Sequence, residues 1–406
     1  MHVVLLTHYF PPEVGAPQSR LAALASGLRA RGIEVCVHTA FPHYPDGVVQ
    51  IPYRNRLAQR DRDAGVVRSA VYATPNQGFA RRLANHLSFA ASALVTCPLT
   101  GPADVVVVES PPLFLAAAGV LYARAKRAAL VVNVADRWPA SAVELGALTH
   151  PGAIRAAQAL ERACYRHAAA VTVPTHGLLE ALHALPEAAG KVRRIPPAVD
   201  VERFAAIAPR PDRDGPLHVL YAGTVGLAHG LETLVEAAAR LGPEQVQVRI
   251  AGSGAEAPTV RAAIQRVGAG NVELLGVVTA GEIPALYAWA DVGAVLLRDR
   301  PVFAGALPTK MLEIMASGRA VVISARGEAA QLVVDASAGV AVSPEDPNAL
   351  AEALEALHRD PARVRALGAA GRHTAERSFE RKGAIASWHD LLDTAITPKG
   401  DTCRTH

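Results

Sequence analysis

Short apolar runs alternate with segments of helical periodicity along this chain, and the whole pattern occurs twice. Runs such as Val3–Leu6 and Ala320–Ser324 have the length of a strand and consist almost entirely of apolar residues. Strands of this kind are buried on both faces, and parallel strands need long crossover connections, usually helices. The alternation therefore predicts parallel sheets covered by helices on both faces, which is a doubly wound α/β fold.

The alternation is interrupted once, by the Pro-, Arg- and Asp-rich stretch Pro209–Pro216. Because 406 residues exceed one typical hydrophobic core, we expect a domain boundary here. The predicted domains are residues 1–200 and 217–378, joined by a linker at 201–216. Residues 379–406 should add a final helix, which either completes the second domain or crosses back to the first, and a tail.

The expected elements follow from the apolar runs and the helical periodicity. In the first half we expect strands at Val3–Leu6, Glu34–Thr39, Val66–Tyr72, Asp104–Val108, Leu130–Val134, Ala169–Pro174 and Val192–Ile195, and helices at Arg20–Arg31, Ala80–Leu94, Phe114–Arg127 and Ile154–His167. In the second half we expect strands at His218–Tyr221, Val246–Ala251, Val272–Leu275, Val292–Leu297, Ala320–Ser324 and Ala338–Val342, with helices between and after them.

Composition excludes several classes of protein. No run of about 18 uncharged apolar residues is present, and the longest candidate, Leu87–Leu99, is too short to span a bilayer. The start of the chain resembles a first strand rather than a secretory signal, so we expect a cytoplasmic protein. The net charge of +4 is weak evidence for an anionic partner and does not indicate a nucleic-acid binder. The four cysteines are far apart, which predicts neither a disulfide framework nor a metal site.

The stretch Gly305–Val322 is the most informative for function. A Gly/Pro loop leads into a short helix that carries Lys310 in its first turn and Glu313 three residues later. Free backbone N–H groups at a helix N-terminus and a lysine suit a phosphate, while a carboxylate on the same face can accept two hydroxyl protons from a ribose. The alternative from this window alone is an amphipathic helix with a salt-bridged surface.

Two loops of the first half carry further candidates. Gly15 and Ala16 lack bulk, so backbone there can approach a ligand closely, and Arg20 follows in the next helix. The alternative is a plain turn with a surface arginine. Asp136 stands beside Arg137 and Trp138 after a buried strand, where it could hold sugar hydroxyls or assist proton transfer. The alternative for Asp136 is a helix N-cap.

Two glycine-rich loops of the second half follow strands and precede helices, an arrangement that suits phosphate. Neither has the spacing of a dinucleotide-binding or Walker motif, so each is weak alone. The Asp-x-Asp sequences at Asp61–Asp63 and Asp212–Asp214 lie in Arg-rich loops, and we expect no metal there. The candidate loop residues are Gly223, Thr224, Gly226, His229, Gly252 and Gly254.

Taken in order, these pieces resemble glycosyltransferase family 4, over nearly the whole chain from Thr7 to about Leu392. The resemblance looks closest to the bacterial branch that includes L-fucosamine transferases and other cell-surface polysaccharide transferases. It implies the GT-B fold, with two Rossmann-like domains facing across a cleft. The matching pieces are His8–Arg20, Phe41–Pro45, Ser110–Phe114, Asp136–Pro139, Ala222–Gly230 and Phe303–Lys310 with Glu313.

The resemblance also implies roles for individual residues. Glu313 would hold the donor ribose, Lys310 would face the diphosphate and the donor sugar, and Gly15 would lie under the diphosphate. The turn at Gly252 and the residues around Val277 would flank the nucleobase. Lys310 and Asp136 are thus the expected catalytic residues. The expected donor-binding residues are Gly15, Ala16, Arg20, Gly223, Thr224, Gly226, His229, Gly252, Gly254, Val277, Gly305, Ala306, Leu307, Pro308, Thr309, Lys310 and Glu313.

The chain departs from the wider family at three places. Gly305 stands where the family has the first Glu of a Glu-x7-Glu pattern. Thr224 and His229 lie in the loop where the family has Arg and Lys. Pro197 and Ala198 interrupt a usual Pro-Asn-Gly-Val-Asp sequence.

The resemblance implies a retaining transfer from a nucleoside-diphosphate sugar, most commonly a UDP-sugar, without metal or other cofactor. The acceptor would be a glycan, a lipid-linked molecule or a small molecule, and not a nucleic acid. The basic and apolar helix around Arg81–Ala90 could contact the inner face of a membrane, or simply pack on its own sheet. A nucleotide-sugar epimerase, a phosphorylase and a non-catalytic nucleotide-sugar-binding protein remain open as alternatives.

Overall fold

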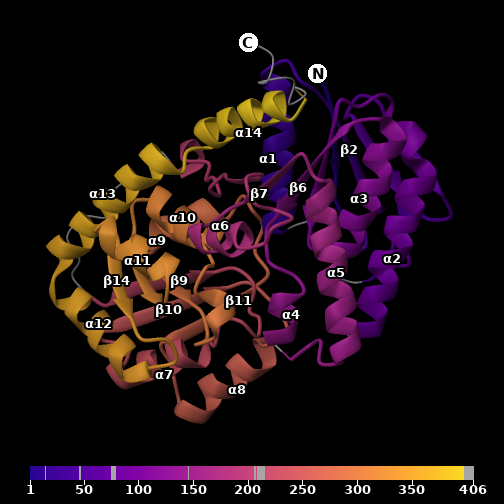
Figure 1. The fold of residues 1–406 in the computed structure, drawn as a ribbon. Coiled ribbons are helices and arrows are strands. Elements are labelled where there is room, and N and C mark those ends of the chain that lie inside the picture. The colour runs from indigo at the N-terminus through magenta and orange to yellow at the C-terminus, as the bar shows by residue number, and fades with distance from the viewer. Residues whose placement is uncertain are drawn as a thin grey trace. The chain divides into compact units, whose positions relative to one another are not determined.

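The computed structural model describes residues 1–13, 15–44, 47–74, 79–144, 146–204, 207 and 215–396, without the side chains of Ala16, Phe79 and Ala80. The chain forms two compact units (Figure 1). The first contains Met1–Pro196 and the C-terminal residues from Ala384 on, and the second contains Pro197–Gly383. Each unit is a sheet with helices on both faces, so the predicted doubly wound α/β plan is confirmed.

The first unit has an eight-stranded sheet in the order β3-β4-β2-β1-β5-β6-β7-β8. All neighbours are parallel except β3 and β4, which pair antiparallel with Ala58 opposite Ser69. The strands are β1 (His2–Leu6), β2 (Glu34–Ala40), β3 (Ala58–Asp61), β4 (Val66–Ser69), β5 (Val105–Ser110), β6 (Ala129–Val134), β7 (Ala170–Val173) and β8 (Val192–Arg194). The helices are α1 (Ala16–Ala30), α2 (Phe79–Thr96), α3 (Leu113–Lys126), α4 (Ala140–Glu144), α5 (Pro151–His167), α6 (His176–His183) and α14 (Arg381–Ile396).

Successive residues of the central strands serve opposite faces of this sheet, as the two-residue period of a strand requires. Val4 and Leu6 of β1 pack with α2, α3 and α5 in one cluster. Val3 and Leu5 pack with α1 and α14 in the other. Gly27 permits the contact between α1 and α14, because a Cβ there would lie 1.9 Å from the Cδ1 of Ile385.

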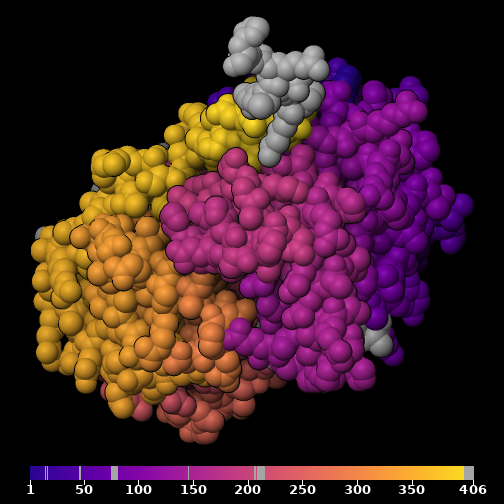
Figure 2. Space-filling model, viewed as in Figure 1, coloured from indigo at the N-terminus to yellow at the C-terminus, as the bar shows by residue number. Residues whose placement is uncertain are grey.

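The second unit has a six-stranded, entirely parallel sheet in the order β11-β10-β9-β12-β13-β14. Helices α7, α8 and α12 pack on one face, and α9, α10 and α11 pack on the other. Helix α13 contributes Val364 to the first cluster and Ala375 to the second. The outer sides of α12 and α13 form part of the molecular surface (Figure 2). The elements are β9 (Leu217–Ala222), α7 (Glu232–Leu241), β10 (Val246–Ala251), α8 (Ala257–Val267), β11 (Val272–Gly276), α9 (Ile283–Trp289), β12 (Val292–Leu296), α10 (Thr309–Ala316), β13 (Ala320–Ser324), α11 (Glu328–Asp335), β14 (Gly339–Val342), α12 (Pro347–Arg359) and α13 (Pro361–Ser378).

Most predicted elements are found within a few residues of their expected bounds, but four elements differ. Helix α1 begins at Ala16 rather than Arg20, with a proline in its first turn, where proline is well tolerated. Strand β3 and the short helices α4 and α6 were not predicted. Within the described ranges, no helix is both long enough and apolar enough to cross a membrane.

Candidate functional site

The candidate loops of the second unit follow adjacent strands, so the parallel sheet places them along one edge. The loop after β9 binds the loop after β10 through backbone hydrogen bonds. The N–H of Gly223 donates to the oxygen of Ala251 at 2.8 Å, and the N–H of Val225 donates to Ser253 at 2.9 Å. The N–H of Gly252 in turn donates to Gly276 at the end of β11, at 2.7 Å. These three loops therefore form one connected surface.

Close backbone approach explains two of the glycines. A Cβ at Gly252 would lie 1.8 Å from the oxygen of Gly223, and a Cβ at Gly254 would lie 2.3 Å from the oxygen of Val225. Both glycines also have positive φ, at 140° and 159°. No other residue fits these positions without movement of the loops. Val277, which follows the same edge, is 82% exposed.

Lys310 lies in the first turn of α10, as the sequence predicts. Its Nζ donates to the hydroxyl of Tyr221 at 2.5 Å and lies 3.9 Å from the centroid of that ring. The Tyr221 hydroxyl donates onward to the carbonyl of Thr224 at 2.6 Å, so the lysine is joined to the loop after β9. Burial lowers the pKa of Lys310 to about 7, although Glu313 raises it in part.

Glu313 follows one helical turn after Lys310 and is partly buried. Burial raises the pKa of its carboxyl group, while the charges of Arg203 and Lys310 lower it. Among the residues that the structure describes, none forms a hydrogen bond or an ion pair with the Glu313 carboxylate. Both oxygens are therefore available to accept hydroxyl protons from a diol.

The N-terminus of α10 is open to an anion. Its N-cap is Pro308, which makes no side-chain capping bond, so the N–H groups of Thr309 and Lys310 begin the helix uncapped. The loop before it is anchored by the oxygen of Ala304, which accepts the N–H of Glu328 at 2.7 Å. Gly305, Ala306 and Leu307, between anchor and helix, are partly buried. An uncapped helix N-terminus of this kind suits an anion, and phosphate binding by this loop stays a prediction.

One ring nitrogen of His229 is engaged in a hydrogen bond. Its Nδ1 lies 3.1 Å from the oxygen of Leu296, which requires an N–H there and leaves Nε2 as an acceptor in the neutral ring. Burial, followed by the charge of Lys310, lowers the pKa of His229 to about 4. A neutral His229 can accept a hydroxyl proton, but it contacts a phosphate oxygen favourably only when protonated.

Arg298 is a residue of this edge that sequence reasoning missed. Its guanidinium pairs with Glu345 at 3.0 Å, Glu232 at 3.5 Å and Glu256 at 3.6 Å. It also donates from Nε to the oxygen of Leu227 at 2.8 Å. Arg298 therefore holds the loop after β9 to three other segments. Its position directly after β12 was the available signal.

The first unit places its predicted residues at the corresponding edge of its own sheet. Gly15 is the N-cap of α1, and Ala16 is the first residue of that helix. The Arg20 guanidinium pairs with the buried Glu109, whose other oxygen accepts from the Asn133 side chain at 2.5 Å. Arg20 is thus already engaged by a carboxylate.

Asp136 lies in the turn after β6 and is exposed. Its carboxylate accepts the Ser141 hydroxyl at 2.8 Å. This bond fixes the turn but leaves the second carboxylate oxygen open to solvent.

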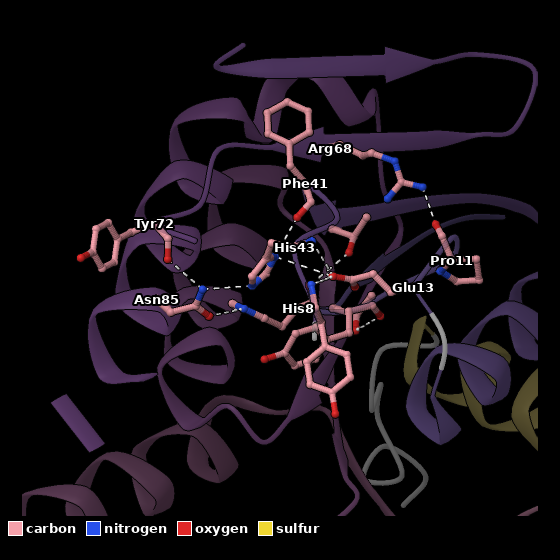
Figure 3. A network of polar contacts seen from close by, with 12 residues as sticks. His8, Pro11, Glu13, Phe41, His43, Arg68, Tyr72 and Asn85 are labelled. Carbon is pink, nitrogen blue, oxygen red and sulfur yellow. Dashed lines mark hydrogen bonds and ion pairs between the residues drawn. The ribbon is translucent and has the colours of Figure 1, made fainter. Parts of the chain in front are cut away.

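A second polar cluster, shown in Figure 3, was also missed as a site. It joins His8, Glu13, His43 and Asn85 from three segments of the first unit. Two of these segments carry the His8–Arg20 and Phe41–Pro45 sequences. Asn85 gave no signal because it stands among other polar residues of α2, such as Arg82, His86 and Ser88, and nothing in the sequence sets it apart.

Comparison with known proteins agrees with this architecture. Residues 15–198 match the glycosyl transferase 4-like domain family, and residues 216–360 match the family described as glycosyl transferases group 1. The chain is similar to Escherichia coli (strain K12) WcaI, named as a colanic acid biosynthesis glycosyl transferase, with 26% identity over 95% of this chain and 98% of that protein.

Two solved structures are similar in fold. Sucrose-phosphate synthase from Thermosynechococcus elongatus has a TM-score of 0.76 and 21% identity, and covers 97% of this chain and 98% of its own. Anabaena HepE in complex with UDP-glucose has a TM-score of 0.71 and 17% identity, and covers 97% and 100%. The chain is therefore a glycosyltransferase of the GT-B fold, with a glycosyl transferase 4-like domain followed by a glycosyl transferases group 1 domain.

Proposed function

We propose that this enzyme transfers a sugar from a nucleoside-diphosphate sugar with retention of anomeric configuration and without a metal. The observation that carries the proposal is the presence of Lys310 and Glu313, one turn apart, on a helix whose N-terminus is uncapped. This arrangement offers a cation and free N–H groups to a diphosphate, and a carboxylate to a ribose diol, within one helical turn.

In this proposal the carboxylate of Glu313 accepts both ribose hydroxyls, and Lys310 and the amides near Thr309 bind the diphosphate. The glycine-rich surface at Gly252 and Gly254 lies against the nucleoside, with Val277 beside the base. We propose UDP as the nucleotide, because the similar HepE structure contains UDP-glucose.

Catalysis would be mainly electrostatic. The bond between the anomeric carbon and the diphosphate oxygen breaks, and the acceptor oxygen bonds to the same face of that carbon. The acceptor proton passes to the departing diphosphate, so no separate base is required. Lys310 and the helix N-terminus stabilise the negative charge that develops on the leaving group. Asp136 would hold sugar hydroxyls or assist the proton transfer.

A test begins with thermal-shift screening against UDP-, GDP- and dTDP-sugars, followed by turnover with the donor that binds. We expect Lys310→Ala to lower kcat mainly, because the leaving-group charge is largest in the transition state. The product should keep the donor's anomeric configuration by NMR, and turnover should survive EDTA. An inverted product, or a Lys310→Ala enzyme impaired only in acceptor KM, would contradict the proposal.

The acceptor class is proposed from relatives. WcaI is named for colanic acid biosynthesis, and on this basis we propose a glycan or lipid-linked acceptor at the cytoplasmic face of a membrane rather than a small-molecule acceptor. The closer relationship to L-fucosamine transferases stays a prediction.

Helix α2 has a surface suited to peripheral membrane contact. Its outer side exposes Leu87 and Val95, at 44% and 80%, and Arg81 and Arg82 are exposed at its start. Apolar side chains beside arginines favour an anionic lipid surface. Co-sedimentation with anionic liposomes should decrease with salt and in an Arg81→Glu/Arg82→Glu variant. Equal sedimentation with neutral liposomes would remove the proposal.

A further inference from the structure

Two sequences that have no role in the proposed reaction, His8–Glu13 and Phe41–Tyr44, are bonded to each other in the first unit. One carboxylate oxygen of Glu13 accepts the backbone N–H of both His43 and Tyr44, each at 2.8 Å. Glu13 is 6% exposed, so these charge-assisted bonds are shielded from water. The loop after β1 and the loop after β2 are therefore held together immediately before Gly15.

Asn85 of α2 joins the same two loops through its side-chain amide (Figure 3). The Oδ1 atom lies 2.8 Å from Nε2 of His8. The Nδ2 atom lies 3.0 Å from Nε2 of His43 and 2.8 Å from the carbonyl oxygen of Tyr72. Both N–H donors and the carbonyl of the amide are thus in use, and three segments meet at one side chain.

The acceptors around this cluster fix where each proton lies. Nδ1 of His43 is 2.8 Å from the carbonyl oxygen of Phe41, so it carries the proton and Nε2 is bare. Nδ2 of Asn85 can then donate to His43. Its Oδ1 must accept, so His8 carries its proton on Nε2. The structure therefore assigns opposite neutral tautomers to the two histidines.

His8 has no place for a second proton. Its Nδ1 is buried and has no hydrogen-bond partner in the described part of the chain. Burial, then His86 and His43, lower the pKa of His8 well below its usual range. The pKa of the neighbouring His86 is lowered to about 4 by burial and by Arg82. The other titratable or charged groups facing the cluster are Tyr9 and Glu13 from the loop after β1, Tyr44 from the loop after β2, Arg68 from β4, and Arg82 and His86 from α2.

We propose that Asn85 is a positioning residue. By accepting from His8 and donating to His43, it fixes the loop that leads into Gly15 and the first turn of α1. That turn begins without a side-chain cap, and Gly15 at its start is a predicted donor-binding residue. The functional consequence rests on the proposed function, but the proton arrangement does not.

The discriminating variant is Asn85→Asp, which keeps shape and an acceptor but removes both donors. Its carboxylate can still accept from His8, but one oxygen now faces both the carbonyl oxygen of Tyr72 and the bare Nε2 of His43. A hydrogen bond can form there only when Nε2 of His43 also carries a proton, in addition to the proton on Nδ1 that faces Phe41. That second proton is available at low pH and is lost as the pH rises. Asn85→Asp should therefore be less impaired at low pH than at high pH, while the loss of the bond to Tyr72 remains at both.

We expect kcat/KM for the donor to fall about 10- to 100-fold at pH 8 relative to the wild type, with part of the loss recovered near pH 5.5. The acceptor KM should not change. Adding His43→Gln, which cannot gain a charge, should abolish the recovery at low pH. Ser92→Ala, on the same helix but bonded instead to Ala70, should keep the wild-type pH profile and serves as the matched control.

Nitrogen-15 NMR of the histidine rings provides a readout that does not need turnover. We expect Nδ1–H for His43 and Nε2–H for His8 in the wild type, and a doubly protonated His43 at low pH in Asn85→Asp. The other tautomers, or a loss in Asn85→Asp that is equal at every pH, would overturn the inference. If the wild type binds no nucleotide sugar, the proposed function fails while the tautomer result still decides the network.

Discussion

Binding of a nucleotide sugar at pH 8 should take up nearly one proton, and Lys310 should be the group that receives it. The amine lies partly buried against the ring and hydroxyl of Tyr221, and its pKa is lowered to about 7 because burial disfavours the charged form. A bound diphosphate would place negative charge beside it and favour the ammonium form. The pKa of Lys310 should then rise to its ordinary range or higher.

The size of the uptake follows from these values. With a pKa of about 7, only about a tenth of the free enzyme carries a charged Lys310 at pH 8, whereas nearly all of the complex does. The expected uptake is about 0.9 proton at pH 8 and about 0.1 at pH 6. Donor affinity should consequently fall about tenfold for each pH unit above 7, since each binding event must first charge the lysine.

Titration calorimetry in buffers of different ionisation enthalpy measures this uptake directly, because the observed enthalpy changes in proportion to the protons exchanged. The diphosphate of a nucleotide sugar does not titrate in this range. Lys310→Arg, with a permanently charged guanidinium, should show no uptake, and His229→Gln should leave the uptake unchanged. An enthalpy at pH 8 that is independent of buffer, or an uptake that persists in Lys310→Arg, would refute the assignment.

Three further predictions follow from the same edge of the second sheet. Glu313→Ala should raise the donor KM about 10- to 100-fold, through loss of hydrogen bonds to a charged carboxylate, and leave Tm within a few degrees; unchanged donor kinetics would exclude the ribose role. Tyr221→Phe should shift the alkaline limb of the pH profile of kcat/KM about one pH unit lower, because the charged Lys310 loses a hydrogen-bond acceptor. Tyr122→Phe in the first unit is the control and should leave that limb in place. Gly252→Ala should lower the free energy of unfolding by about 2–3 kcal/mol, as measured by denaturant titration. Gly270→Ala is the control and should change this free energy little, because a Cβ added there meets open space. Equal stabilities of the two variants would show that the loops tolerate the contact at Gly252.

The sequence predicted the sheets well because their strands are buried on both faces. Every residue is buried in Val105–Val108 and in Val292–Leu296, so neither strand needs polar residues and both apolar runs are continuous. Strand β3, Ala58–Asp61, has no such run, since it is an edge strand with partly or fully exposed residues. Its pairing depends on β4 rather than on its own composition.

The start of α1 shows a different limit. Its Gly-Ala-Pro sequence resembles a loop, but Ala16 is the first helical residue and the proline follows inside the first turn. Proline lacks an N–H, and the first turn of a helix does not need one. The same residues are therefore compatible with a loop and with a helix start, and packing of the helix decides between them.

Within the site, the sequence could predict groups that share one element but not groups that meet through the fold. Lys310 and Glu313 are separated by one helical turn, so their spacing alone places them together. Arg298 and Asn85 act by joining segments that are distant in sequence, and only the position of Arg298 after β12 offered a signal. Gly252 is intermediate, because its loop was predicted but the carbonyl of Gly223, which requires the glycine, was not.

Two departures from the family pattern remove a charged side chain from the second unit. Thr224 supplies no charge where the wider family has a cation, and Gly305 supplies none where it has a carboxylate. Arg298 stands nearby, but three carboxylates within 3.6 Å already compensate its charge. Stabilisation of a departing diphosphate by this unit thus depends on Lys310 and the amides of α10. A lysine that is only half charged near pH 7 would then connect catalysis to pH more strongly than a site with a permanent guanidinium.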